Sequence, residues 1–170
     1  MKQFFLILSL VVLTGLSAHA QRFAFVDVDR ILNTDPEYAT AQAQLDQLAA
    51  KWKQEISAEY TKIDDMYRKY QAEQVLLSET VRQQREDEIV NKEKEVRELQ
   101  KKRFGPEGDL FKQRQELVQP IQERVYNAIQ GYAEDRGFDF IFNRGSGAEL
   151  LYANPEMDRT DDILKRLGLN

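Results

Sequence analysis

Residues 45–70, LDQLAAKWKQEISAEYTKIDDMYRKY, carry an apolar or aromatic side chain every three or four positions. The successive spacings are 3, 4, 4, 4, 3, 4 and 3, and the residues are Leu45, Leu48, Trp52, Ile56, Tyr60, Ile63, Tyr67 and Tyr70. A stripe at this spacing lies along one face of an α-helix, and the extra spacing of four near Trp52 is a coiled-coil stutter. The stretch therefore predicts a long helix that buries a narrow seam.

The charge around this seam excludes a wide core. Residues 51–116 hold 15 basic and 15 acidic side chains in 66 positions, and charged side chains are rarely buried without a partner. A thinner apolar stripe follows Ser78, with Arg85 and Lys92 at seam positions. We therefore expect two antiparallel helices that turn near Leu77-Ser78 and pair loosely towards the tip. The alternative, a disordered charged linker, does not account for the aromatic periodicity.

The segment FGPEG, residues 104–108, interrupts the second helix with a proline and two glycines. A proline inside a helix costs about 3 kcal/mol, so a helical break is expected here. With a turn near residue 77, Gly105 and Pro106 face residues 49–50 of the first helix, one turn from Trp52 and the stutter. We interpret Gly105-Pro106 as a hinge at the root of a projecting arm, and a passive loop is the alternative.

Three short stretches have strand character: RFAFVDVD (22–29), FDFIFN (138–143) and AELLYA (148–153). The last two are expected to form a hairpin through the turn at 144–147, and the first is expected to join them. The predicted fold is α+β but mainly α, with a small three-stranded association domain and a long helical hairpin. The predicted units are an arm at 51–105 and a β-rich base formed by 21–50 and 106–170.

The first strand is apolar on both faces, which requires cover on both sides. A three-stranded sheet is near the lower limit of independent stability, and its exposed edges favour pairing with other chains. Association of identical subunits through their sheets would meet both needs, and cyclic symmetry would close the assembly. The residues predicted to form this interface are Phe23, Phe25, Val26, Val28, Leu150 and Tyr152.

Residues 1–20 read as a secretory signal, with Lys2, an apolar run from Phe4 to Leu16 and a cleavage site after Ala20. The run is shorter than the roughly 20 residues that span a bilayer. Cleavage would remove the only histidine, His19, and the chain has no cysteine, so Ser-His and Cys-His catalysis and the usual zinc sites are excluded. We expect no enzymatic activity, cofactor or metal, and a mature net charge of −6 argues against nucleic-acid binding.

Acidic residues are the remaining candidates for chemistry. Asp27 and Asp29 are interpreted as polar positions at a strand end. Asp161 and Asp162 follow Thr160, which suits a helix N-cap with acids in the first turn. A carboxylate-dependent hydrolase would need two such acids in a concave site, and acids on exposed helices do not provide one.

Several segments together resemble the Skp/OmpH family of periplasmic chaperones: FAFVDVDRIL after the signal, the charged hairpin, LVQPIQERVYNAIQGYAEDRGFDFIFN and LLYANPEMDRTDDILKRL. The resemblance covers nearly the whole mature chain. It implies a homotrimer whose small β-rich domains form a hub, while three helical arms enclose a cavity for unfolded outer-membrane proteins, without ATP. It also implies a periplasmic location, and a weak contact with the membrane surface or lipopolysaccharide belongs to the same expectation.

The function predicted from these features is that of an ATP-independent holdase. Flexible methionine and aromatic side chains suit adaptable binding, so the predicted client contacts are Met66, Tyr67, Tyr70, Val75, Leu76 and Leu77. For Tyr67 and Tyr70, packing against the partner helix is the alternative role. A trimeric coiled-coil spacer or tether of the cell envelope is the alternative function. It would need continuous apolar positions between subunits, whereas the hairpin has only enough for its own seam.

Overall fold

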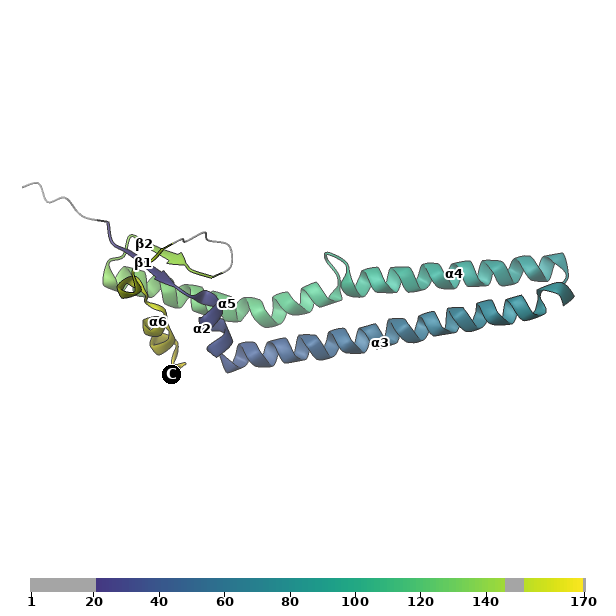
Figure 1. The fold of residues 1–170 in the computed structure, drawn as a ribbon, viewed down its shortest axis with the longest axis horizontal. Helices are drawn as coiled ribbons and strands as arrows, with labels where there is room; N and C mark the ends of the chain where they lie inside the picture. Colours follow the sequence, from purple (N-terminus) through teal and green to yellow (C-terminus); the bar gives the residue numbers. More distant parts are fainter. Residues whose placement is uncertain (1–20, 146–151, 170) are drawn as a thin grey trace, which may run out of the picture.

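The structure is a computed structural model that describes residues 21–145 and 152–169. Figure 1 shows a base at one end of the molecule and a long two-helix arm that projects from it. No helix within the described ranges is both long and apolar enough to cross a membrane. The elements in chain order are β1 (Phe23–Val26), α2 (Val28–Thr34), α3 (Pro36–Glu73), η1 (Gln74–Leu76), α4 (Glu79–Phe104), α5 (Asp109–Arg136), β2 (Phe140–Asn143), η2 (Pro155–Met157) and α6 (Thr160–Leu167).

The arm is the antiparallel hairpin predicted from the apolar seam. Helix α3 has 38 residues and is therefore about 57 Å long at 1.5 Å per residue. It begins where the Asp35 carboxylate accepts the Glu37 amide and Pro36 occupies the first turn, both of which favour a helix start. The chain reverses through η1, and α4 begins at Glu79, so the predicted turn near Leu77-Ser78 is confirmed. The Ser78 side chain makes no capping hydrogen bond.

The predicted break at FGPEG is also present. Helix α4 ends at Phe104 and α5 starts at Asp109, and the Gly108 amide donates to the Gly105 carbonyl oxygen over 2.9 Å. Figure 1 shows the loop projecting sideways while α4 and α5 continue in nearly the same direction. The loop is thus a local excursion between two helices. Whether it bends as a hinge stays a prediction.

The sheet differs from the sequence-based expectation. Strands β1 and β2 pair in parallel, with Phe23 opposite Phe140 and Val26 opposite Asn143. These two strands form the sheet of the described residues. The third expected strand, 148–153, falls mostly outside them, together with Leu150 and most of the expected hairpin, and Tyr152 is not in a strand.

The first strand is shorter than predicted, because Val28 begins helix α2. The Asp27 carboxylate accepts the Arg30 amide over 2.8 Å, which caps that helix at its N-terminus. The assignment of Val28 to the first strand is therefore wrong, while its place in a subunit interface stays a prediction. Side-chain capping at Asp27 overrides the β-branched pattern that favoured an extended chain.

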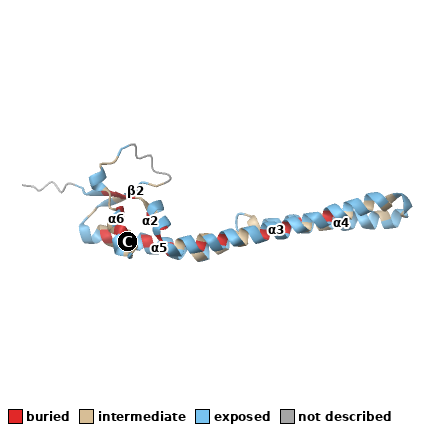
Figure 2. Ribbon diagram, turned by 60° about the horizontal axis from the view of Figure 1, so that its bottom comes forward, coloured by how far each residue is buried: buried red, intermediate tan, exposed pale blue. Residues whose placement is uncertain are grey.

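The base holds the main hydrophobic core. Its buried members come from β1, α2, α3, α5 and α6: Val26, Ile31, Leu32, Ala41, Leu45, Val118, Ile121, Val125, Tyr132, Ile163 and Leu164. The arm has a separate, smaller cluster of Ile56, Ile63 and Val96. Buried residues accordingly concentrate in the base and become sparse along the arm (Figure 2).

The C-terminal helix α6 closes the base, with Asp161 and Asp162 in its first turn as predicted. The N-cap position is Arg159, so the expectation that Thr160 caps this helix is wrong. The Thr160 hydroxyl instead donates to Asp158 over 2.5 Å and accepts the Asp27 amide over 2.9 Å. This buried hydroxyl therefore connects the end of β1 to the start of α6.

Candidate functional site

The root of the arm is held by a cluster around Trp52, opposite the helix break as expected. Trp52 is buried and meets Phe104 edge to face, with ring centroids 6.3 Å apart. The Arg103 guanidinium lies 4.8 Å from the Trp52 ring centroid and forms ion pairs with Asp109 at 2.7 Å and Glu55 at 3.5 Å. Arg103 thus links the end of α4 both to the start of α5 and to α3.

Farther along the arm, tyrosines of α3 bond across the seam to α4. The Tyr60 hydroxyl contacts Gln100 at 3.4 Å, and the Tyr67 hydroxyl donates to Glu93 at 2.8 Å. Tyr70 donates in the same way to Glu86. The hydrogen bonds to these carboxylates raise the pKa of Tyr67 and of Tyr70, because an anionic phenolate could not donate them.

An ion pair replaces an apolar contact where Lys92 occupies the seam. Its ammonium lies 2.7 Å from Glu59 on the facing helix, and Glu59 also pairs with Lys62. The hydrogen bonds from Lys62 and then Lys92 lower the pKa of the Glu59 carboxyl from 4.5 to about 2. The thinner half of the seam is thus joined by charge and hydroxyl contacts.

The predicted client-binding residues fall into two groups. Val75 and Leu76 at the tip are each 84% exposed, whereas Leu77 and Met66 are half-buried. Tyr67 and Tyr70 use their hydroxyls within the hairpin, which favours their alternative role in packing. The tip is therefore the most exposed apolar part of the predicted set.

The base exposes an aromatic cluster on its sheet. Phe23, Phe140 and Phe142 are 39%, 50% and 46% exposed, and their ring centroids are 5.7 to 6.3 Å apart. The alternation of phenylalanines in FDFIFN was the signal for this cluster, but Phe140 and Phe142 were not predicted as interface residues. We call these three residues the phenylalanine cluster.

Other residues predicted to form an interface occupy different environments. Phe25 and Val26 are only 3% and 1% exposed and are already covered within the same chain. Val28 is half-buried, while Tyr152 is 83% exposed. The buried pair does not offer free surface to another subunit in this structure.

The candidate carboxylates have structural contacts. Asp27 caps α2, Asp161 forms an ion pair with Arg30 at 2.7 Å, and Asp162 accepts the Tyr132 hydroxyl at 2.7 Å. Burial and then the bond to Asp162 raise the pKa of Tyr132. Asp29 lies in the first turn of α2. These contacts give three of the four acids a structural role within the base.

The fold and these surfaces define a mainly helical protein with a small base and a projecting helical hairpin. The sequence model of the outer membrane protein (OmpH-like) family matches residues 22–167, and the chain belongs to that family. The resemblance predicted from sequence is confirmed.

Individual relatives agree with this assignment. The chain is 25% identical over 160 residues to the chaperone protein Skp of Yersinia enterocolitica, with 94% of each chain covered. It is 26% identical over 167 residues to an uncharacterized protein of Aquifex aeolicus, covering 98% of this chain and 96% of that one. A crystal structure of an OmpH-like protein from Caulobacter crescentus superposes with a TM-score of 0.67 at 15% identity, covering 90% of this chain and 86% of the other, and so shows the same fold.

Proposed function

We propose that this protein is an ATP-independent holdase of the periplasm that binds unfolded outer-membrane proteins and prevents their aggregation before membrane insertion. The observation that carries the proposal is the arm itself. It projects from the base, buries only a thin seam and ends in the exposed Val75 and Leu76. Membership of the OmpH-like family and similarity to a chaperone support the same function.

The proposed assembly is a homotrimer formed by the base. The phenylalanine cluster supports it, because three adjacent exposed aromatic rings are apolar surface that association would remove from water. A cyclic trimer would place three arms around one cavity. The N-terminal apolar segment at Phe4–Leu16 supports export, with cleavage after Ala20.

The assembly can be tested on the aromatic surface. Phe142→Asp should dissociate the trimer while leaving helix content unchanged, since Phe142 is 46% exposed in the protomer. Phe25→Asp is a poor test because it would place a charge inside the protomer. Light scattering coupled to size exclusion measures the mass, and a monomeric wild-type protein at micromolar concentration would refute the trimer.

The chaperone function can be tested by diluting a urea-unfolded outer-membrane barrel protein into buffer with and without the mature protein. We expect light scattering from aggregates to fall when three chains of the protein are present for each barrel protein, without added ATP. Equal aggregation in both samples would rule out holdase activity. A monomeric globular protein of similar mass and charge controls for crowding.

Client contacts at the tip can be tested in the same assay. The double substitution Val75→Ser with Leu76→Ser should weaken client capture more than the reversal of any single arm charge. It removes apolar contacts between the tip and the client, which are proposed to hold the client. Residues 51–116 carry no net charge, so long-range steering is weak, and capture should change by less than about threefold between low and physiological salt. A steep loss of capture with salt would show that charge clusters hold the client.

A further inference from the structure

One face of α5 is uncharged along nearly its whole length. Its residues follow one another at spacings of 4, 4, 3, 4, 3 and 4, which place them on one side of a helix: Phe111, Gln115, Gln119, Gln122, Tyr126, Ile129 and Ala133. The remaining positions of α5 hold nine charged side chains. We call these seven residues the amide stripe. An uninterrupted neutral stripe is notable where 31% of all residues are charged.

The amide stripe lies beside the buried face of α5 and is itself mostly open. Phe111 is 46% and Tyr126 68% exposed, and all three glutamines are exposed. Gln115 and Gln122 make no side-chain hydrogen bond within the described part of the chain, and Gln119 donates to Glu123 over 2.7 Å. The stripe is therefore an accessible surface whose side-chain amides are available for hydrogen bonds with a ligand.

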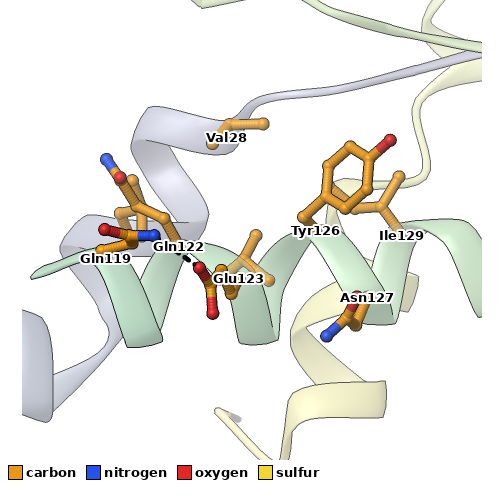
Figure 3. Close-up of a pocket in the computed structure, with 9 residues that line it drawn as sticks. Val28, Gln119, Gln122, Glu123, Tyr126, Asn127 and Ile129 are labelled. Atoms are coloured by element: carbon orange, nitrogen blue, oxygen red, sulfur yellow. Dashed lines mark hydrogen bonds between the residues drawn. The ribbon is translucent and has the colours of Figure 1, made fainter.

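Its central part borders an open groove of about 580 Å³ between α2 and α5. Val28, Leu32 and Val125 supply apolar lining, while Gln119, Gln122 and Tyr126 bring polar groups beside it. Figure 3 shows the Tyr126 side chain rising from α5 on the side of the helix where Val28 of α2 lies. Apolar walls with a few polar groups at the edge are typical of binding grooves.

The chemistry of the stripe matches an extended polypeptide. Each glutamine amide can both donate and accept a hydrogen bond, as a backbone amide does, and aromatic rings add contact area at little cost in side-chain entropy. The stripe itself carries no charge, so its side chains suit a neutral occupant. The Glu123 carboxylate also lines the groove and already accepts the Gln119 amide. The stripe is about 33 Å long for 22 helical steps, and an extended membrane-barrel strand of 9–11 residues spans roughly 30–36 Å.

We propose that the amide stripe of α5 binds an extended, uncharged segment of an unfolded barrel protein, in addition to the contacts at the arm tip. This inference rests on the proposed holdase function and places part of the client beside the base. A second copy of the chain is a less suitable occupant, because interfaces between identical subunits are usually more apolar than a glutamine-rich face. The phenylalanine cluster is the more apolar surface of the base and suits that role.

The test introduces charge without changing shape. Gln115→Glu with Gln122→Glu should weaken binding of a urea-unfolded barrel protein about tenfold, because carboxylates on the stripe would have to be desolvated by a neutral segment. The matched control is Gln47→Glu with Gln84→Glu, which adds the same charge at exposed positions of α3 and α4 and should change affinity less than about twofold. Circular dichroism and light scattering establish that fold and assembly are kept.

A photoreactive benzoyl-phenylalanine at position 126 identifies the occupant directly. We expect an adduct with the client, and Ser57, exposed on α3 away from the stripe, provides the control position. An adduct only with a second copy of the chain, or equal affinity of the stripe and control variants, would overturn the inference. If the wild-type protein binds no client at all, the proposed function fails instead, so the two failures are distinguishable.

Discussion

The base and the arm use the same kinds of side chain in different proportions. In the base, five elements contribute to one core with fully buried members such as Ile31 and Ile163. In the arm, two helices share a cluster of three buried residues, with Trp52 and Ile89 also buried along the seam. Tyrosine hydroxyls and ion pairs add contacts between these sparse apolar positions. Figure 2 makes the contrast visible as buried positions become sparse away from the base.

This difference separates the tasks of the two regions. The base gains most of its stability from apolar burial, which fixes one packed arrangement. The arm leaves most of its side chains in water and closes with contacts that each contribute little. A region with few buried contacts opens locally at lower free energy than a packed core, so the arm is the part of the chain that can adapt to a bound partner.

The largest expected effect on stability comes from replacing one buried isoleucine by alanine in each of the two regions. Ile31→Ala in the base should lower the free energy of unfolding by about 3–4 kcal/mol, since an isoleucine that is 0% exposed leaves a cavity among packed neighbours. Ile63→Ala in the arm should mainly raise amide hydrogen exchange in α3 and α4. Urea unfolding and hydrogen exchange measure both. If both variants lost amide-exchange protection equally in the base and in the arm, the two regions would not differ in local stability.

A smaller effect is expected from ion pairs in different surroundings. Asp35 is 1% exposed, caps α3 and pairs with Arg124 at 2.5 Å. Arg124→Gln should cost roughly 1–2 kcal/mol, because it leaves a buried carboxylate with fewer partners, although the arginine itself is 44% exposed. The matched change on the arm, Arg97→Gln, removes an exposed pair with Glu93 and should cost under about 0.5 kcal/mol. Thermal unfolding followed by calorimetry compares them.

A substitution at the junction between base and arm should change the range of directions that the arm adopts relative to the base. Arg103→Gln removes the link between α4, α5 and Glu55, so the arm should vary more in direction. Spin labels are attached at Ser78→Cys and Gln130→Cys, and the labelled protein is diluted with unlabelled subunits so that distances within one chain are measured. The distribution of the distance between the two labels should become broader in Arg103→Gln. The control Arg97→Gln should leave this distribution unchanged. An unchanged width in both variants would leave FGPEG as a passive loop.

Gly105→Ala is unsuited to test the hinge alone. A Cβ atom at that position would overlap the Lys101 carbonyl oxygen, so the substitution would displace the end of α4. Pro106 is exposed, and Pro106→Ala is the milder change at the same loop.

The smallest effect is a pH dependence confined to the arm. The folded pKa of Glu59, about 2, lies below the unfolded value of 4.5, so its contribution to stability is complete above pH 4.5 and is lost as the pH falls towards 2. The stability difference between wild type and Glu59→Gln should therefore shrink across that interval. Urea unfolding of the arm at pH 6 and at pH 3 measures it, and a constant difference would exclude the Lys62 and Lys92 contacts as its source.

Much of the arm could be predicted because its signals are local. The spacing from Leu45 to Tyr70 defines one helix face, and the Gly105-Pro106 pair, followed two residues later by Gly108, marks the end of α4. A single proline or glycine is a weaker signal, since Pro120 and Gly131 lie inside α5. The turn at Leu77-Ser78 follows from the end of the first stripe. Val75 and Leu76 are exposed at this turn, where no facing residues remain.

Other parts depended on partners distant in sequence. The fold buried Phe25 and Val26 inside the protomer, whereas two apolar strand faces had suggested contact with another subunit. The pairing of Asp35 with Arg124 joins residues 89 positions apart. The spacing of the amide stripe can be read from the sequence. Its exposure depends on the tertiary structure, in which α5 buries the adjoining face instead.

The sequence by itself determined the long charged hairpin, its turn and its break, because helical periodicity and chain breakers act over a few residues. The resemblance of several segments, above all the first strand and the last 50 or so residues, indicated the family. The tertiary structure decided which apolar residues are core and which are surface. Leu45 and Phe25 are buried, whereas Phe142 and Tyr126 are exposed, although all four occur in apolar patterns. Burial depends on which elements pack together, and that choice is made by contacts between distant segments rather than by the residue or its neighbours.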